Sequence, residues 1–381
     1  MIKVCFIITK LELGGAQKVA LYTAEHINKD AFEEFLITGK GGILDSFAAE
    51  KFKIYQLSNL IREISPLKDL KALLHIYGVL KREKPDIVHT HSSKAGILGR
   101  IAAKLARVKV IIHTVHGYSF NETQVFFKKK FYVLLEKLCS FFSDKLIAVA
   151  EEDIKKGLKY KIAKKSKFVL IRAGIDTGYY KNFAAGRDFR TSLGISAKAK
   201  VIITIGPFKP QKNLKDFINA AKLVSEVHKD AIFLVAGDGE MRPGLEALIS
   251  SLGLRDKIML LGWRNDIAEL LYASDIFVLT SLWEGLPCSI VEAMCCSKPV
   301  VANAVDGVKE IVQDGKTGFL TEPRDYASTA EKINYLLSDQ KELYEMGKRA
   351  KEAVTEEFDI NHTVCEHEKL YSETLGKITP A

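Results

Sequence analysis

The sequence of 381 residues has few cysteines, and none of them is placed as zinc ligands usually are. The six cysteines form no CxxC pair and no cysteine–histidine spacing typical of zinc. Cys295 and Cys296 are adjacent, which is poor geometry for a structural disulfide. We therefore expect reduced, buried thiols, as in a cytoplasmic protein.

Long apolar runs are also missing. No stretch approaches the roughly 18 residues that cross a bilayer. The apolar run at residues 1–8 is too short for a secretory signal and lacks a small-residue cleavage site, so we expect a first strand there. These absences predict a soluble protein, which can still lie on a membrane surface.

Charge is unevenly distributed along the chain. Lysine and arginine number 56 and aspartate and glutamate 47, a net charge of +9. Residues 1–180 have 31 basic and 18 acidic side chains (+13), whereas residues 181–381 have 25 and 29 (−4). The basic half indicates an anionic partner: nucleic acid, a phosphate-bearing substrate or a membrane surface.

Short runs rich in valine and isoleucine alternate with segments of helical period, which is typical of parallel sheets covered by helices, an α/β fold. The pattern runs once through the first half and restarts after residues 175–196, which we interpret as a linker. The polar region 341–375 is predicted to be helical and to lie on the outside. The expected strands are Lys3–Ile8, Phe35–Thr38, Ile54–Leu57, Ile87–Thr90, Val110–Thr114, Lys145–Val149, Phe168–Ile171, Val201–Ile205, Ile232–Ala236, Ile258–Leu261, Ile276–Leu279, Val300–Ala302 and Gly318–Leu320.

Two loops of the first half have residues suited to polar ligands. Gly14 and Gly15 follow the first strand and open a helix, where backbone amides can approach an anion or simply form a tight turn. A third glycine at GxGxxG spacing is missing, which disfavours a dinucleotide site.

His113 and His116 are three residues apart and should face opposite sides of their strand, with His116 past its end. His116 can donate a hydrogen bond to a sugar hydroxyl or serve as a structural residue, and the same choice holds for the histidines at 89 and 91.

Lys209 and Lys212 follow the first strand of the second half, in the run GPFKPQKN. Two lysines at a helix N-terminus can hold a diphosphate by charge together with backbone donors, or can simply be solvated. The run is not a Walker A loop, because GxxxxGK[ST] is absent.

Glu284 and Glu292 stand eight residues apart, across a Gly-Leu-Pro turn that starts a helix. Pro287 suits the first helical turn, where its missing N–H does no harm. One carboxylate can accept hydrogen bonds from sugar hydroxyls and the other from the vicinal hydroxyls of a ribose. Two surface glutamates on an amphipathic helix would leave the surrounding SLW and GLP runs unexplained.

These motifs together resemble the retaining glycosyltransferases of family 4, which have the GT-B architecture. The pattern Glu284-x7-Glu292 in SLWEGLPCSIVEAMCCSKPVVA is similar to the E-x7-E signature of that family. The resemblance runs from Gly14-Gly15 through HTVHG and FKPQKN to DGKTGFL. The segment 89–106 followed by HTVHG is similar to the subgroup that builds bacterial capsule, exopolysaccharide or lipopolysaccharide.

The resemblance implies two Rossmann-like parallel-sheet domains that face each other across a cleft. Residues 1–180 would form the acceptor-binding domain and residues 187–357 the nucleotide-sugar donor-binding domain. Residues 358–381 would form a helix that crosses back to the N-terminal domain.

The resemblance also implies residue roles. The catalytic residues would be His116, Glu284 and Lys212. Gly15 would lie against the donor diphosphate, and Lys212 would neutralise the leaving diphosphate. His116 would hydrogen-bond the transferred sugar and help stabilise the reaction centre. Glu284, with the amides of Gly285 and Leu286, would hold the donor sugar; Glu292 would bind the ribose, and Arg264 would line the base pocket. The family commonly has an arginine at the position of Pro207, so Lys209 is the candidate for a second positive charge.

The expected activity is transfer of a sugar, with retention, from a nucleotide-diphosphate sugar to an acceptor hydroxyl of a lipid-linked or polysaccharide intermediate in cell-surface glycan biosynthesis. A UDP-sugar is favoured by analogy with the subgroup. No D-x-D run occurs, which agrees with GT-B enzymes that need no divalent metal, and no cofactor is expected. A sugar-nucleotide epimerase, a glycoside phosphorylase and a non-catalytic nucleotide-sugar-binding subunit remain as alternatives. A glycoside hydrolase would also use two carboxylates, but has no need of phosphate-binding lysines.

The basic first half has its own interpretation. Aromatic residues and lysines interleave in 126–132, and seven more lysines lie in 155–167. Such clusters suit an anionic bilayer surface or only aid solubility, and no nucleic-acid-binding motif accompanies them. We expect a cytoplasmic protein that is peripheral on the inner face of the cell membrane.

Overall fold

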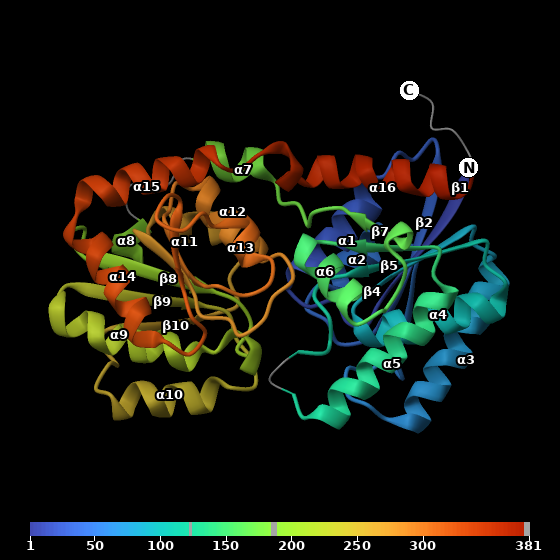
Figure 1. Cartoon of the computed structure of the whole chain (residues 1–381), viewed down its shortest axis with the longest axis horizontal. Helices are drawn as coiled ribbons and strands as arrows, with labels where there is room; N and C mark the ends of the chain where they lie inside the picture. The colour runs from blue at the N-terminus through green and yellow to red at the C-terminus, as the bar shows by residue number, and fades with distance from the viewer. Residues whose placement is uncertain (122–123, 184–188, 377–381) are drawn as a thin grey trace. The chain divides into compact units, whose positions relative to one another are not determined.

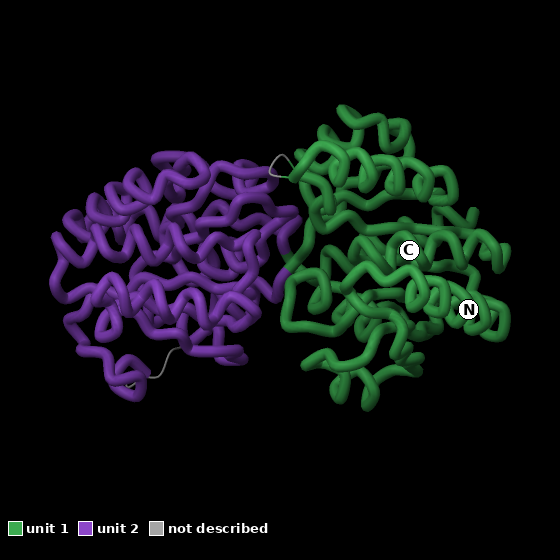
Figure 2. Tube along the Cα trace, turned by 90° about the horizontal axis from the view of Figure 1, so that it is seen from below, with its two compact units in different colours: residues 1–174, 359–381 green, residues 175–358 purple. Residues whose placement is uncertain are grey.

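The protein is described by a computed structural model that covers residues 1–121, 124–183 and 189–376. It has two compact units, Met1–Gly174 with Asp359–Ala381 (the N-terminal unit) and Ile175–Phe358 (the C-terminal unit) (Figure 2). The expected domain start at residue 187 and the expected helical residues 377–381 lie outside the described residues.

The N-terminal unit is built on a seven-stranded sheet in which every pairing is parallel (Figure 1). Its strands, in spatial order, are β3 (Ile54–Leu57), β2 (Phe32–Gly39), β1 (Ile2–Ile8), β4 (Ile87–His91), β5 (Val110–Val115), β6 (Lys145–Ala148) and β7 (Phe168–Leu170). Its helices are α1 (Gly15–His26), α2 (Asp45–Lys51), α3 (Pro66–Glu83), α4 (Ser93–Ala106), α5 (Phe126–Phe142), α6 (Glu151–Lys159) and α16 (Ile360–Thr374).

Strand β1 shows why helices cover both faces of this sheet. Its side chains alternate between faces, and both sets are apolar. Phe6 and Ile8 pack in one core with residues of α1 and α16. Cys5 and Ile7 pack in the other, with residues of α3 and α4.

Helix α16 corrects the prediction of an outer polar helix at 341–375. That region is divided into α15 (Gln340–Glu352), a 3₁₀ turn and α16. Tyr371 is fully buried, and Val364, His367 and Leu370 are buried with it. The buried positions recur at helical spacing, but threonine and histidine among them hide the apolar stripe in the sequence.

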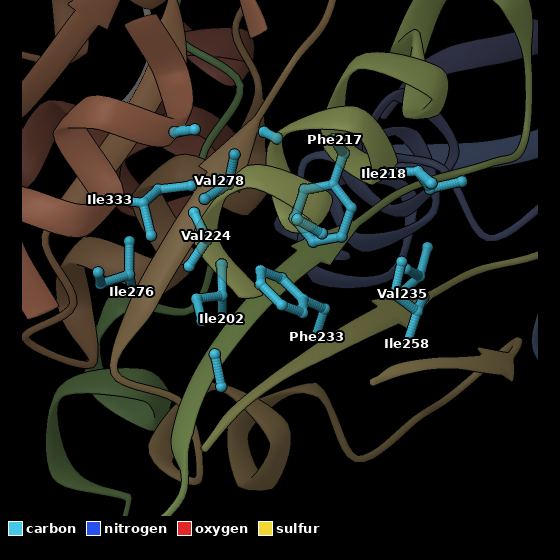
Figure 3. Close-up of a cluster of buried hydrophobic side chains, with 14 of the residues drawn as sticks. Ile202, Phe217, Ile218, Val224, Phe233, Val235, Ile258, Ile276, Val278 and Ile333 are labelled. Carbon is cyan, nitrogen blue, oxygen red and sulfur yellow. The ribbon is translucent and has the colours of Figure 1, made fainter. Parts of the chain in front are cut away.

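The C-terminal unit has a six-stranded parallel sheet in the order β10-β9-β8-β11-β12-β13, the arrangement of Rossmann folds. The strands are β8 (Lys200–Ile205), β9 (Ala231–Ala236), β10 (Ile258–Gly262), β11 (Ile276–Leu279), β12 (Val300–Asn303) and β13 (Gly318–Thr321). Its helices are α15 together with α7 (Thr177–Asn182), α8 (Phe189–Ser192), α9 (Leu214–Val227), α10 (Arg242–Ser251), α11 (Ile267–Tyr272), α12 (Cys288–Cys295), α13 (Val308–Ile311) and α14 (Tyr326–Ser338). Figure 3 shows its core, where Phe217 of α9 meets Phe233 of β9 edge to face, with ring centroids 6.0 Å apart.

The α/β class and the two parallel sheets are therefore confirmed. Each predicted strand is present, although β2 begins at Phe32 and not at Phe35. The cysteines are all free, but only four are buried: Cys288 is half-buried and Cys365 is exposed. No helix within the described ranges is long and apolar enough to cross a membrane.

A buried ion pair fixes α5 on α4. Arg100 of α4 is fully buried, and its Nη2 donates to Glu136 Oε2 at 2.8 Å. Its Nε donates to the carbonyl of Gly96 at 2.8 Å. Removing one partner of such a pair leaves a buried charge without compensation, which is far more costly than losing an exposed pair.

We expect Glu136→Ala to lower the free energy of unfolding of the N-terminal unit by about 3–5 kcal/mol. Both tryptophans, Trp263 and Trp283, lie in the C-terminal unit, so urea unfolding followed by far-ultraviolet circular dichroism and by fluorescence separates the units. Lys109→Ala is the control, because Lys109 pairs with Asp86 at the surface. Equal shifts for the two variants would contradict the assignment.

Candidate active site

The site of the C-terminal unit lies where its sheet reverses strand order, between β8 and β11. The carboxyl ends of these two strands point to the same edge, and ligands of doubly wound sheets bind at such a switch point. The loop after β8 contains Lys212, and the loop after β11 contains Glu284. The fold thus brings together two predicted residues that are 72 positions apart.

Lys212 and Glu284 form a closely paired, largely buried couple. Lys212 Nζ donates to Glu284 Oε1 at 2.5 Å, and the two side chains are 13% and 8% exposed. Ser281 Oγ donates to the same oxygen at 2.6 Å, and Gln211 Nε2 donates to Oε2 at 3.3 Å. The carboxylate is therefore oriented by three donors from two loops.

The two loops are also tied through their backbones. The hydroxyl of Thr280 donates to the carbonyls of Lys212 and Asn213, each at 3.1 Å. The amide of Leu282 donates to the carbonyl of Gln211 at 2.8 Å. The amide of Glu284 donates to Asp306 Oδ2, after β12, at 2.9 Å. This network holds the Lys212–Glu284 pair in place.

Close packing of the loops after β8 and β9 requires glycine. Gly237 has φ +144°, and a Cβ built there would lie 1.9 Å from the carbonyl oxygen of Gly206. No other residue fits at that distance, so the two loops approach as only glycine allows.

Other predicted residues lie at the same edge but make different contacts. Arg264 follows β10 and forms a two-pronged ion pair with Asp266, which raises the pKa of Arg264. Lys209 directly precedes the 3₁₀ turn that ends at Lys212. Glu292 is buried in α12 beside Tyr180, whose pKa is raised by burial and then by that carboxylate.

Gly285 and Leu286 follow Glu284 and lead into α12. In the described part of the chain, their backbone amides donate no hydrogen bond. Pro287 immediately precedes α12 and does not lie within it, as its extended backbone shows.

The N-terminal unit buries five of the nine histidines: His89 and His91 of β4, His113 of β5, His116 just after β5, and His367 of α16. His89 bonds to the hydroxyl of Tyr371 at 2.6 Å and to Thr114 Oγ1 at 2.7 Å. Ring contacts join this histidine to His91 and to His367 of α16. His113 lies on the other face of the sheet, bonded to Thr90 Oγ1 at 2.9 Å, so the predicted opposition of His113 and His116 is confirmed.

His116 stands just after β5, and its Nε2 lies 3.1 Å from Nδ1 of His91. Burial lowers the pKa of His116 to about 4 and that of His367 to about 3, and takes the pKa of His89, His91 and His113 well below the usual value. These imidazoles are therefore neutral at pH 7 and can donate or accept a hydrogen bond.

Gly14 and Gly15 lie where β1 leads into α1, at the switch point of the N-terminal sheet between β1 and β4. Gly15 is the first helical residue and Gly14 the N-cap. Within the described ranges, no three histidine, cysteine, aspartate or glutamate side chains are grouped as a metal site.

Sequence reasoning missed Gln211, Ser281 and Asp306. Gln211 is adjacent to Lys212 and Ser281 lies three residues before Glu284, so both stand in motifs that the sequence analysis quotes and could have been found there. Asp306 has no such signal, since its contact depends on β12 lying beside β11. The sequence alone does not decide whether His91 is structural or binds a ligand. The parallel register of β4 with β5 places it beside His116.

Comparison with known proteins establishes the family. The description "Glycosyltransferase Family 4" matches residues 13–179, and "Glycosyl transferases group 1" matches residues 187–353. A relative of Escherichia coli, named UDP-Gal:alpha-D-GlcNAc-diphosphoundecaprenol alpha-1,3-galactosyltransferase, is 36% identical over 369 residues, 95% of each chain. The chain belongs to the family 4 glycosyltransferases.

One further relative and one solved structure are also similar to this chain. N,N'-diacetylbacillosaminyl-diphospho-undecaprenol alpha-1,3-N-acetylgalactosaminyltransferase of Campylobacter jejuni is 27% identical over 340 residues, 86% of this chain and 87% of that one. The Anabaena protein HepE, solved with UDP and glucose, superposes with a TM-score of 0.84 at 23% identity, over 99% of this chain and 100% of that one. The expected GT-B fold is thereby confirmed.

The neutral histidine cluster predicts that acid destabilises the N-terminal unit of the transferase. On unfolding, each imidazole regains an ordinary pKa near 6.5 and binds a proton that the folded unit excludes. The unfolded state therefore binds more protons below pH 6.5, and stability falls as the pH is lowered from about 6.5 towards 4.

Hydrogen exchange of the β4 and β5 amides at pH 7.5 and 5.0, corrected for intrinsic rates, measures this loss. The C-terminal unit contains one histidine, His228, and is the internal control. Unchanged protection of β4 and β5 at pH 5.0 would refute the prediction.

Proposed function

We propose that the transferase moves a sugar, with retention of configuration, from a UDP-sugar to a hydroxyl of a lipid-linked acceptor in cell-surface glycan synthesis. The observation behind this proposal is the Lys212–Glu284 pair at the switch point between β8 and β11. The relatives add substrate class: the E. coli protein is named for a UDP-galactose donor and a diphosphoundecaprenol acceptor, and the C. jejuni protein for a diphospho-undecaprenol one.

Lys212 is proposed to bind the donor diphosphate. Its ammonium group is paired with Glu284, so an incoming diphosphate can take over the lysine and free the carboxylate for sugar hydroxyls. The amides of Gly285 and Leu286 are then available to the same sugar. Lys209 would add the charge that the family arginine gives elsewhere.

Further donor contacts follow from the family pattern. Glu292 would turn from Tyr180 to the ribose hydroxyls, and Arg264 would line the base pocket while Asp266 holds its guanidinium. Gly15, at the start of α1, would meet the diphosphate with its amide.

His116 is proposed to bind the transferred sugar as a neutral imidazole. With Nε2 turned to His91, Nδ1 remains for a sugar hydroxyl. In the reaction, the bond between the anomeric carbon and the phosphate oxygen breaks, and the acceptor oxygen bonds to that carbon on the same face. The acceptor proton passes to the departing diphosphate, whose charge Lys212 stabilises.

The site of action is proposed to be an anionic membrane surface, met by the N-terminal unit. That unit has 33 basic and 21 acidic residues, a net charge of +12, whereas the C-terminal unit has 23 and 26, a net of −3. Donor phosphates are bound mainly by lysines of the less basic unit, so they do not account for this excess.

Transfer of radiolabelled sugar from UDP-, GDP- and ADP-sugars to a membrane extract tests the function, with a thermal-shift panel of UDP, GDP and ADP to rank the base. We expect incorporation into lipid-extractable material and the largest thermal shift with UDP. Proton NMR of the product should show the anomeric configuration of the donor. No incorporation, with release of free sugar or epimerised donor, would refute the proposal.

Lys212→Ala should lower kcat/KM by about 10²–10³-fold, because the leaving diphosphate loses its cationic partner in the transition state. UDP should also bind more weakly, which isothermal titration measures. Lys215→Ala is the matched control, since Lys215 is exposed on the first turn of α9, three residues away. A Lys212→Ala enzyme as active as the control would remove Lys212 from the mechanism.

The transfer is also proposed to need no divalent metal, because lysine charge stabilises the leaving group. The rate should be the same, within about twofold, after dialysis against EDTA as in Mg²⁺ or Mn²⁺. A tenfold or greater loss on EDTA treatment, restored by either cation, would contradict this.

A further inference from the structure

Helix α5 exposes large apolar side chains although two of its three buried residues are polar. Its buried residues are Glu136, Cys139 and Ser140. The outward residues form what we call the α5 stripe: Phe127, Phe131, Leu134, Leu138 and Phe141, which are 82%, 51%, 55%, 48% and 77% exposed. Ordinary surface helices show the opposite arrangement.

The spacing of the α5 stripe makes it one continuous face. Successive members are three or four residues apart, so they line a single side of the helix over about 20 Å. Figure 1 shows α5 on the same side of the N-terminal sheet as α3 and α4. An exposed apolar face of this length marks a surface that meets another apolar phase or molecule.

Specific contacts explain why Glu136 and Ser140 of α5 are buried. Glu136 meets Arg100 at 2.8 Å, and Ser140 Oγ donates to the carbonyl of Ile162 at 2.5 Å. These contacts fix the rotation of α5 about its own axis. The stripe is therefore held outward by the fold.

Lysines lie beside the part of the α5 stripe that contains Phe127, Phe131 and Leu134. A groove of about 730 Å³ lies beside it, lined by α5 residues and by Lys159, Tyr160 and Lys161 at the end of α6. The described residues that line it include five lysines and no acidic side chain. Lys130 lies over the ring of Phe126 at 4.5 Å and Lys129 over Tyr160 at 5.0 Å, so the cations stand at the apolar rim.

We propose that the α5 stripe and the lysine-lined groove dock the transferase onto an anionic lipid bilayer, with α5 lying in the plane of the interface. The apolar side chains enter the acyl boundary, and the lysines meet anionic headgroups. This inference rests on the proposed function, which gives the enzyme an acceptor in the membrane.

Charge separates a bilayer from a second copy of the chain. Two copies that met through this face would bring two lysine-rich grooves together, which is repulsive. An anionic leaflet neutralises the same lysines. Lys167 lies in the predicted lysine cluster but does not belong to this surface. Its Nζ instead donates to the carbonyls of Ser140 and Ser143 at the C-terminal end of α5.

Co-sedimentation of the full chain with vesicles tests the proposal. The vesicles contain phosphatidylcholine with or without about one third phosphatidylglycerol, at low and high salt. We expect binding to the anionic vesicles only, weakened by salt. Phe127→Ser with Phe141→Ser should lower the partition coefficient at least tenfold, and Lys130→Gln with Lys137→Gln by about fivefold for each lysine.

The matched control is Val227→Ser with Tyr344→Ser, two exposed apolar residues of the C-terminal unit, and it should bind as the wild type does. Equal binding to both vesicle types, no binding at low salt, or undiminished binding by the phenylalanine variant would overturn the proposal. So would sedimentation equilibrium that shows a dimer which the phenylalanine variant dissociates.

A transfer assay with a short-chain, water-soluble diphosphate-linked acceptor keeps the two proposals apart. The phenylalanine variant should keep its rate on this acceptor and lose it on acceptor embedded in vesicles. Transfer without vesicle binding would overturn the docking surface alone. Vesicle binding without transfer to either acceptor would overturn the proposed function alone.

Discussion

Parallel strand pairing is the constraint on which both units depend. Because every strand of a sheet runs the same way, all the loops that leave carboxyl ends gather at one edge. In the C-terminal unit this places Lys212 beside Glu284. In the N-terminal unit it places His116 beside His91 and puts the Gly14–Gly15 turn at the strand reversal. The chemistry therefore depends on strand order more than on nearness along the chain.

The two units differ in charge and polarity. The C-terminal unit has few excess charges, and its key lysine is largely buried and paired with a carboxylate. We propose that this pair separates when the donor binds, because a diphosphate offers the lysine a stronger partner. The N-terminal unit keeps five buried histidines neutral and has five lysines beside the exposed apolar face of α5. Under the proposed function, the C-terminal unit would bind the small anionic donor and the N-terminal unit would meet the anionic membrane surface.

The sequence predicts the strands and the two-sheet organisation, and it singles out Lys212 and Glu284, because each rests on a local pattern: short β-branched runs, the FKPQKN run and two glutamates eight apart. It does not predict that Lys212 and Glu284 contact each other. It does not predict the burial of α16, since His367 and Tyr371 pack against strands more than 270 residues earlier. The same is true of the outward face of α5, whose rotation is set by Arg100 on another helix. The predicted cluster of seven lysines in 155–167 also includes one too many surface lysines, because only the fold shows that Lys167 binds backbone carbonyls.

The central claim is that the Lys212–Glu284 pair opens to receive the donor diphosphate. A crystal structure of the transferase with UDP tests it most directly. We expect the diphosphate at the carboxyl ends of β8 and β11, within hydrogen-bond distance of Lys212 Nζ, with Lys212 separated from Glu284. UDP bound with the 2.5 Å Lys212–Glu284 contact intact, or bound at another edge of the sheet, would contradict it.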